Sequence, residues 1–175
     1  ALRQELAAYL ERTRGLHVGP ENIVIAPGCK IALFLAMMAV LDPGDEVLYP
    51  DPGFPGYSSI TLGLGAIPVP FELLERRHFQ PDPDEIASKI TPRTKVLMTN
   101  SPANPTGTVY TDDVQRRLAQ IAVQHDLLVM SDEIYARIIY GDQYHSMMSY
   151  PGMSERTMIL DGFSKSFAMT GWRLG

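Results

Sequence analysis

Polar side chains suited to chemistry gather in four segments of the chain, and each segment follows an apolar run. An amine such as that of Lys165 can form a Schiff base with a carbonyl group, and a carboxylate such as that of Asp132 can hold or move a proton. We therefore interpret the four segments as parts of one candidate site, which the fold must bring together. The segments are Pro27-Gly28-Cys29-Lys30, the loop from Asn100 to Gly107, the run Ser131-Asp132-Glu133-Ile134-Tyr135, and the stretch from Gly162 to Gly175.

The elements that would position these segments alternate between short apolar runs and runs with helical periodicity. This alternation predicts βαβ units, a mostly parallel sheet and a three-layer α/β/α fold in one domain over residues 1–175. Ligands of such sheets bind beyond the carboxyl ends of the strands, where the four segments are expected to lie. Strands are expected at 23–26, 46–49, 66–70, 95–99, 127–131 and 157–161, and helices at 2–10, 29–41, 55–62, 82–90 and 111–125.

Signatures of several other enzyme classes are absent from the sequence. No G-x-G-x-x-G follows an expected strand, and no Walker A or G-x-S-x-G motif is present. Gly162 stands where an S-x-x-K motif ending at Lys165 would need serine. The four histidines lack the spacing of metal ligands, so no metal site is predicted.

Three runs, in their order and spacing, resemble the class I/II aminotransferases: N-P-T-G at 104–107, S-D-E-I-Y at 131–135 and S-K-S-F-A-M-T-G-W-R-L-G at 164–175. These are fold-type-I enzymes that use pyridoxal 5'-phosphate (PLP), and the resemblance extends along essentially the whole chain. It implies transfer of an amino group between an amino acid and a 2-oxo acid, on the truncated core of the family's large, PLP-binding domain. Family members also have an earlier N-terminal segment and a small C-terminal domain, and neither is expected within residues 1–175.

The resemblance implies three catalytic residues, Lys165, Asp132 and Tyr135, and places Asn104 among the residues that bind the cofactor. Lys165 would form the internal aldimine with the cofactor and then move a proton as a general base. Asp132 would keep the ring nitrogen of the cofactor protonated, which makes the ring an electron sink. Tyr135 and Asn104 would hydrogen-bond the phenolate oxygen of the cofactor, and a cis peptide bond is expected between Asn104 and Pro105.

The resemblance also implies how the rest of the cofactor is held. Phe54 would stack on the ring, and Ser164 and Arg173 would bind the phosphate, since a guanidinium grips a phosphate with two hydrogen bonds. The junction Gly28-Cys29-Lys30 would add backbone N–H groups at a helix N-terminus, with Lys30 contributing its backbone more than its side chain. Plainer alternatives are a surface lysine at 165, a helix N-cap at Asp132, a turn residue at Asn104, core packing for Tyr135 and Phe54, and a tight turn at 28–30.

Composition narrows the partners and the compartment. The net charge of −5 argues against a nucleic-acid partner, which would need a basic surface. The longest apolar run, 31–41, is too short for a membrane span of about 20 residues. The single cysteine, Cys29, excludes an internal disulfide, and the charged first residues differ from a secretory signal, so a cytoplasmic protein is expected. The resemblance implies a homodimer.

Two other functions remain open from the sequence. A PLP-dependent carbon–sulfur β-lyase would use the same cofactor residues but divert the reaction to β-elimination. A non-catalytic remnant or regulatory module would hold PLP without turnover. The amino-acid substrate is not specified by the residues present.

Overall fold

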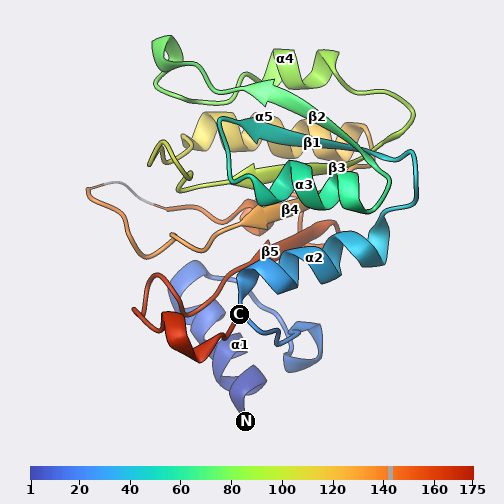
Figure 1. The fold of residues 1–175 in the computed structure, drawn as a ribbon. Coiled ribbons are helices and arrows are strands. Elements are labelled where there is room, and N and C mark those ends of the chain that lie inside the picture. The colour runs from blue at the N-terminus through green and yellow to red at the C-terminus, as the bar shows by residue number, and fades with distance from the viewer. Residues whose placement is uncertain (142–143) are drawn as a thin grey trace.

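Figure 1 shows a parallel five-stranded sheet packed between helices in this computed structural model, which describes residues 1–141 and 144–175. The strands are β1 (Glu46–Asp51), β2 (Ile67–Glu72), β3 (Thr94–Asn100), β4 (Leu128–Asp132) and β5 (Thr157–Leu160). The α-helices are α1 (Leu2–Arg14), α2 (Cys29–Val40), α3 (Gly56–Gly63), α4 (Pro83–Ser88) and α5 (Asp112–Gln124). Short 3-10 helices are η1 (Pro20–Asn22), η2 (Glu75–Arg77), η3 (Met147–Ser149) and η4 (Thr170–Trp172).

The strand order is β2-β1-β3-β4-β5, and all neighbouring strands are parallel. Because β1 lies between β2 and β3, the connections that leave β1 and β3 diverge to opposite sides. In such sheets a crevice forms at this switch point, beyond the carboxyl ends of the strands. The polar segments at 100–107, 131–135 and 162–175, which follow β3, β4 and β5, therefore meet at the carboxyl ends of the strands.

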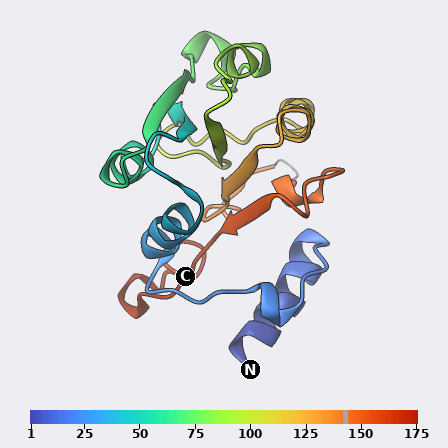
Figure 2. The same cartoon turned by 90° about the vertical axis from the view of Figure 1, so that its right-hand side faces the viewer.

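The three layers are visible in the edge-on view of Figure 2, with α2 and α3 on one face of the sheet and α4 and α5 on the other. Alternate strand residues face opposite layers, as the two-residue period of a strand requires. Val47 and Met98 join the core under α2 and α3, whereas Leu48 and Leu97 join the core under α5. All four are fully buried. The predicted three-layer α/β/α fold is confirmed.

The helix α5 illustrates how local sequence sets these elements. It begins after Thr111, whose Oγ1 accepts a hydrogen bond from the Val114 N–H at 3.4 Å. Such N-cap bonds satisfy amide groups that have no partner inside the helix. Leu118 and Ala122 lie on its buried face, as their helical spacing predicts, and Arg116 is exposed on the other face.

Five of the six expected strands are present, with bounds shifted by one or two residues, but the strand expected at 23–26 was wrong. Residues 23–26 form an extended connection between η1 and α2, and Val24 is 79% exposed. Ala26 exchanges two backbone hydrogen bonds with Gly175, at 2.8 and 3.0 Å. The apolar composition of this run therefore does not reflect burial inside the sheet.

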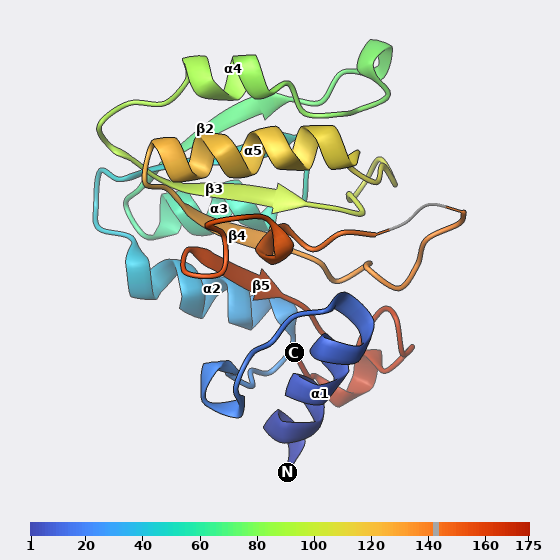
Figure 3. The same cartoon turned by 180° about the vertical axis from the view of Figure 1, so that it is seen from behind.

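The apolar run 31–41 lies in α2, which packs Leu33 and Met37 against the sheet. Among the residues that the structure describes, no helix combines the length and apolar character needed to cross a membrane. Beyond β5, at the opposite edge of the sheet from β2, lies α1 (Figure 3).

Candidate active site

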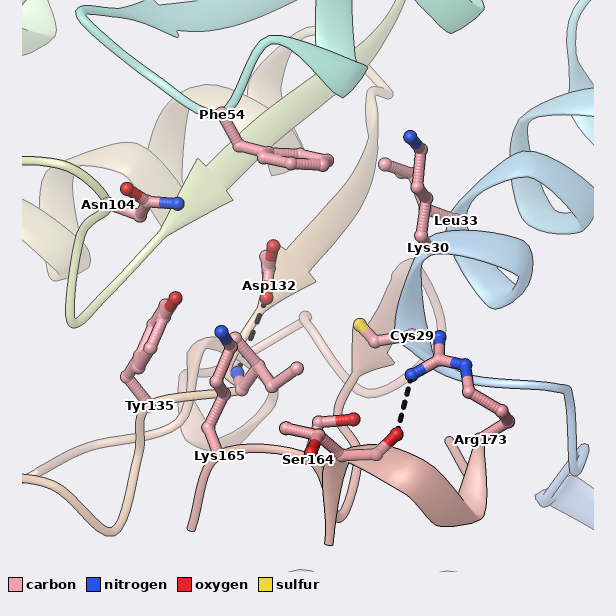
Figure 4. A pocket seen from close by; sticks show the side chains of 12 residues that line it. Cys29, Lys30, Leu33, Phe54, Asn104, Asp132, Tyr135, Ser164, Lys165 and Arg173 are labelled. Carbon is pink, nitrogen blue, oxygen red and sulfur yellow. Dashed lines mark hydrogen bonds between the residues drawn. The ribbon is translucent and has the colours of Figure 1, made fainter. Parts of the chain in front are cut away.

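A cavity of about 270 Å³ lies at the carboxyl ends of the strands, beside the N-terminus of α2 (Figure 4). Nine of the ten residues that the sequence predicted to bind the cofactor line this cavity, and Gly28 is the exception. The lining residues are Cys29, Lys30, Leu33, Phe54, Asn104, Asp132, Ile134, Tyr135, Ser164, Lys165, Thr170 and Arg173. The structure therefore brings together lining residues that are up to 144 positions apart in the sequence, from Cys29 to Arg173.

Asp132 ends β4, and its carboxylate is buried at the wall of the cavity. Oδ2 accepts a hydrogen bond from the Tyr57 hydroxyl at 2.7 Å, and Oδ1 accepts one from the Ile134 N–H at 3.3 Å. Burial raises the pKa of Asp132 from 3.8 to about 6, although both hydrogen bonds act in the opposite direction. Within the described ranges, no basic side chain forms an ion pair with this carboxylate. A cationic group of a ligand would find a buried counter-charge here.

The loop after β3 is held by the buried side chain of Asn100. Its amide group donates to the carbonyl oxygens of Asp132 and Pro102, at 3.0 and 3.2 Å. Its Oδ1 accepts from the Asn104 N–H at 2.7 Å. One side chain thus fixes the loop that carries Asn104 against the end of β4. The peptide bond between Asn104 and Pro105 is cis, as the resemblance implied.

Lys165 and Tyr135 lie side by side at the edge of the cavity (Figure 4). The Nζ atom of Lys165 is 5.8 Å from the centroid of the Tyr135 ring. Tyr135 is half-buried in the turn after β4, and Lys165 is exposed in the loop after β5. In the part of the chain that the structure describes, Lys165 forms no ion pair.

Arg173 and the N-terminus of α2 form the positive end of the cavity. Nη1 of Arg173 donates to the carbonyl oxygen of Thr170 at 3.0 Å, a bond drawn in Figure 4. A Cβ atom at Gly28 would clash with Nη2 of Arg173, and Gly28 has a φ of 88° that other residues rarely adopt. Gly28 therefore lets the guanidinium approach the helix, where free N–H groups and the helix dipole favour anions.

The side chains of Lys30 and Cys29, at the start of α2, add no positive charge and no nucleophile to the positive end of the cavity. The Lys30 side chain extends away from Arg173 in Figure 4, which leaves its backbone as the part nearer the positive end. Burial raises the pKa of the Cys29 thiol, and the carboxylates of Asp132 and Asp161 raise it further. Cys29 is therefore a neutral thiol at ordinary pH rather than a nucleophile.

Phe54 lies across the cavity from Lys165 and Ser164 (Figure 4). It follows β1 and is half-buried, with one edge packed against Tyr57 at 5.5 Å between ring centroids and an interplanar angle of 78°. The ring thus contributes to both the core and the cavity wall. Ser164 is half-buried in the loop that leaves β5, next to Lys165.

Several residues of the site were missed by the sequence reasoning. Leu33, Ile134 and Thr170 also line the cavity. Tyr57 and Asn100 do not line it but donate hydrogen bonds to Asp132. An apolar residue or a tyrosine on a buried helix is typical of core packing, so the sequence offered no distinguishing signal. Over the described residues, no group of three or more histidine, cysteine, aspartate or glutamate side chains is arranged to hold a metal ion.

Comparison with known proteins agrees with this geometry. The whole chain, residues 1–175, matches the family model for aminotransferase class I and II. It is 44% identical over 176 residues to the aspartate/prephenate aminotransferase of Thermus thermophilus, a match that covers 99% of this chain and 45% of that protein.

Solved structures give the same result. An aromatic aminotransferase from Pyrococcus horikoshii matches with a TM-score of 0.97 and 40% identity, over 99% of this chain and 47% of that one. An N-succinyldiaminopimelate aminotransferase from Mycobacterium tuberculosis matches with a TM-score of 0.96 and 34% identity, over 99% and 46%. The chain thus spans a little under half the length of the relatives it matches. It belongs to the class I and II aminotransferase family.

Proposed function

We propose that this chain forms the cofactor-holding part of a PLP-dependent aminotransferase, with Lys165 as the lysine that binds the cofactor. The observation that carries the proposal is the buried carboxylate of Asp132, which has no cationic partner among the described residues and lines the same cavity as the Lys165 amine. The substrates would be an amino acid and a 2-oxo acid, in keeping with the family.

The residues of the cavity fit the three parts of PLP. The phosphate is an anion, and Arg173 with the N-terminus of α2 supplies an anion site. The pyridine nitrogen is a base, and a buried carboxylate favours its protonated form. The aldehyde requires an amine, which Lys165 provides. Phe54 offers an aromatic face for the ring.

Each side chain would then have one task. Bound PLP supplies an electron sink for negative charge that develops on the substrate. Asp132 would hold a proton on the ring nitrogen through Oδ2 or Oδ1, while Tyr57 keeps its carboxylate in place. Lys165 would move a proton through Nζ as a general base, beside the Tyr135 hydroxyl as a hydrogen-bond donor. Phe54 would cover one face of the site and exclude water.

The proposal extends to the larger protein. Residues 1–175 would be the core of the PLP-binding large domain, because the matches cover less than half of each relative. A homodimer is supported by apolar side chains exposed on the outer face of α2, where Met38 is 51% and Ile31 41% exposed. A cytoplasmic location stays a prediction.

The amino-acid substrate is not selected by the comparisons. The relatives are named for different substrates at similar sequence identity, so their likeness to this chain selects no single amino acid.

The test is to trap the cofactor on its lysine. Purified protein incubated with PLP and reduced with borohydride should carry the label on the peptide that contains Lys165, and Lys165→Ala should carry none. Lys89→Ala is the matched control and should be labelled normally, because Lys89 is a half-buried lysine just after α4 that pairs with Glu85. Label on another lysine would reject the assignment.

Activity separates the reaction types. Exchange of amino groups between amino acids and 2-oxo acids supports an aminotransferase. Pyruvate and ammonia released from a thioether amino acid, without such exchange, would instead identify the carbon–sulfur β-lyase. Labelling without either reaction would identify a module that only binds PLP.

A further inference from the structure

A buried ion cluster joins the N-terminal helix to the two strand ends beside the cavity. Arg14 is the last residue of α1, yet its side chain is only 2% exposed. Nη1 donates to Glu133 Oε2 at 2.7 Å, and Nη2 donates to Asp161 Oδ2. These partners are 119 and 147 residues away in sequence, so the cluster is a purely tertiary contact.

Each partner of Arg14 adjoins a residue of the candidate site. Glu133 directly follows Asp132 at the end of β4. Asp161 directly follows β5 and opens the loop that carries Ser164 and Lys165. A single guanidinium therefore holds the two segments that carry the carboxylate and the amine of the cavity.

The two carboxylates are themselves held firmly. Glu133 is fully buried, and its Oε1 accepts hydrogen bonds from Ser131 Oγ, Ser146 Oγ and the Met147 N–H, at 3.0, 2.7 and 3.3 Å. Oδ1 of Asp161 accepts from the Gly162 N–H at 2.7 Å. Glu133 Oε1 is fixed by β4 and by the 146–147 segment, and Asp161 Oδ1 is fixed by its own loop. The bonds from Arg14 to the other oxygen of each carboxylate therefore hold the two segments relative to each other.

Charge makes this contact strong. Burial raises the pKa of both Glu133 and Asp161, and Arg14 opposes this in each case. Without the guanidinium, the fully buried Glu133 and the partly buried Asp161 would both lack a cation, and both carboxylates raise the pKa of Asp132. Removing one partner of a buried ion pair leaves an uncompensated charge and is strongly destabilising.

We propose that Arg14 is a positioning residue for the cofactor site: by bonding Glu133 and Asp161 at once, it sets the spacing between Asp132 and the Ser164-Lys165 segment. Its role is indirect, because Arg14 does not line the cavity. The inference about the cofactor rests on the proposed function, whereas the inference about spacing concerns this chain alone.

The test uses two substitutions and a matched control. Arg14→Met keeps an unbranched side chain like the aliphatic part of arginine but removes the charge. Arg14→Lys keeps the charge on a single amine, which lacks the planar fork of donors of a guanidinium. Leu16→Ala removes a buried apolar side chain just after α1 and none of the hydrogen bonds of the cluster.

Arg14→Met should weaken PLP binding about tenfold or more in an absorbance titration, the scale for groups that orient binding side chains. Arg14→Lys should recover part of the loss, and Leu16→Ala should bind PLP normally despite lower stability.

Hydrogen–deuterium exchange of the cofactor-free protein supplies a readout that does not need PLP. Arg14→Met should speed exchange in peptides covering 131–136 and 161–168, with little change in peptides of β1 and β2. If Arg14→Met does not fold, Arg14→Met combined with Glu133→Gln and Asp161→Asn removes the charge imbalance and should still show fast exchange in both peptides.

The outcomes separate the two proposals. Wild-type protein that takes no PLP on Lys165 would reject the proposed function and leave the exchange experiment to decide on Arg14. Normal exchange and normal PLP affinity in Arg14→Met would overturn the positioning role alone. Equal losses of PLP affinity in Leu16→Ala and Arg14→Met would also overturn it, because α1 would then act only through global stability.

Discussion

The Tyr57 hydroxyl donates a hydrogen bond to Oδ2 of Asp132 across 2.7 Å, and Tyr57 is fully buried. This bond crosses from α3, which follows β1, to the end of β4, and it holds the carboxylate, which is 8% exposed, at the wall of the cavity. It also favours the charged form of Asp132, against the burial that favours the neutral form. Tyr57 therefore orients the carboxylate and limits how far burial raises its pKa.

Tyr57→Phe should raise the pKa of Asp132 beyond its present value of about 6, because the bond that stabilises the carboxylate is lost while burial stays. PLP binding measured against pH should then fall off at a higher pH on the acid side than in wild type. Tyr110→Phe is the matched control, since Tyr110 is also buried and its hydroxyl forms no hydrogen bond with Asp132. An unchanged acid limb in Tyr57→Phe would contradict the assignment.

The pKa of Asp132 also predicts how the cofactor-free protein responds to pH. Because the pKa rises from 3.8 to about 6 on folding, the folded state holds this proton more tightly, and stability falls as pH rises through this interval. The ionised carboxylate costs on the order of 3 kcal/mol at neutral pH. Asp132→Asn should therefore raise the free energy of unfolding near pH 8, by up to about that amount, and bring no gain near pH 4.

Denaturant unfolding at the two pH values, without PLP, measures this difference. The same substitution should weaken PLP binding, because a neutral amide does not favour a protonated ring nitrogen. If Asp132→Asn is less stable than wild type near pH 8, the prediction is wrong. The ionised carboxylate would then have a stabilising partner in addition to Tyr57 and Ile134.

Asn100→Ala should lower both stability and PLP affinity. It leaves two carbonyl groups and the Asn104 N–H without their partner in a buried place, and each such group costs about 1–3 kcal/mol when unsatisfied. Denaturant unfolding and a PLP titration would measure the two effects. Asn22→Ala, at an exposed asparagine that accepts one bond from Gly19, should change neither by a comparable amount.

The sequence predicts those structural features that depend on neighbouring residues in the chain better than those that depend on distant ones. Buried parallel strands are continuous apolar runs, so β1, β3 and β4 were recognisable, and the polar residues after them located the cavity. The run at 23–26 has the same composition, yet Val24 is 79% exposed, because burial depends on neighbours that composition does not reveal.

The groups that support the cavity lay beyond sequence reasoning for the same reason. Arg14 ends an amphipathic helix and would be expected on the surface, but its side chain is buried by partners more than 100 residues away. Glu133 is fully buried beside Asp132, whereas glutamate is ordinarily exposed. Such contacts depend on how the end of α1 lies against the residues that follow β4 and β5, which no local pattern encodes.

Gly28→Ala tests the positive end of the cavity. The new methyl group would clash with the Arg173 guanidinium, so the guanidinium should move away from the N-terminus of α2. Binding of PLP should weaken, whereas binding of pyridoxal, which lacks the phosphate, should change little because Lys165 and Asp132 are untouched.

Gly44→Ala is the matched control: Gly44 has a similar φ of 93°, but a Cβ there meets nothing within 4 Å. Both variants should lose some stability from the strained backbone, on the order of 1 kcal/mol, but only Gly28→Ala should lose phosphate-dependent affinity. Equal weakening of PLP and pyridoxal would show that Gly28 acts through the fold rather than through an anion site shared by Arg173 and α2.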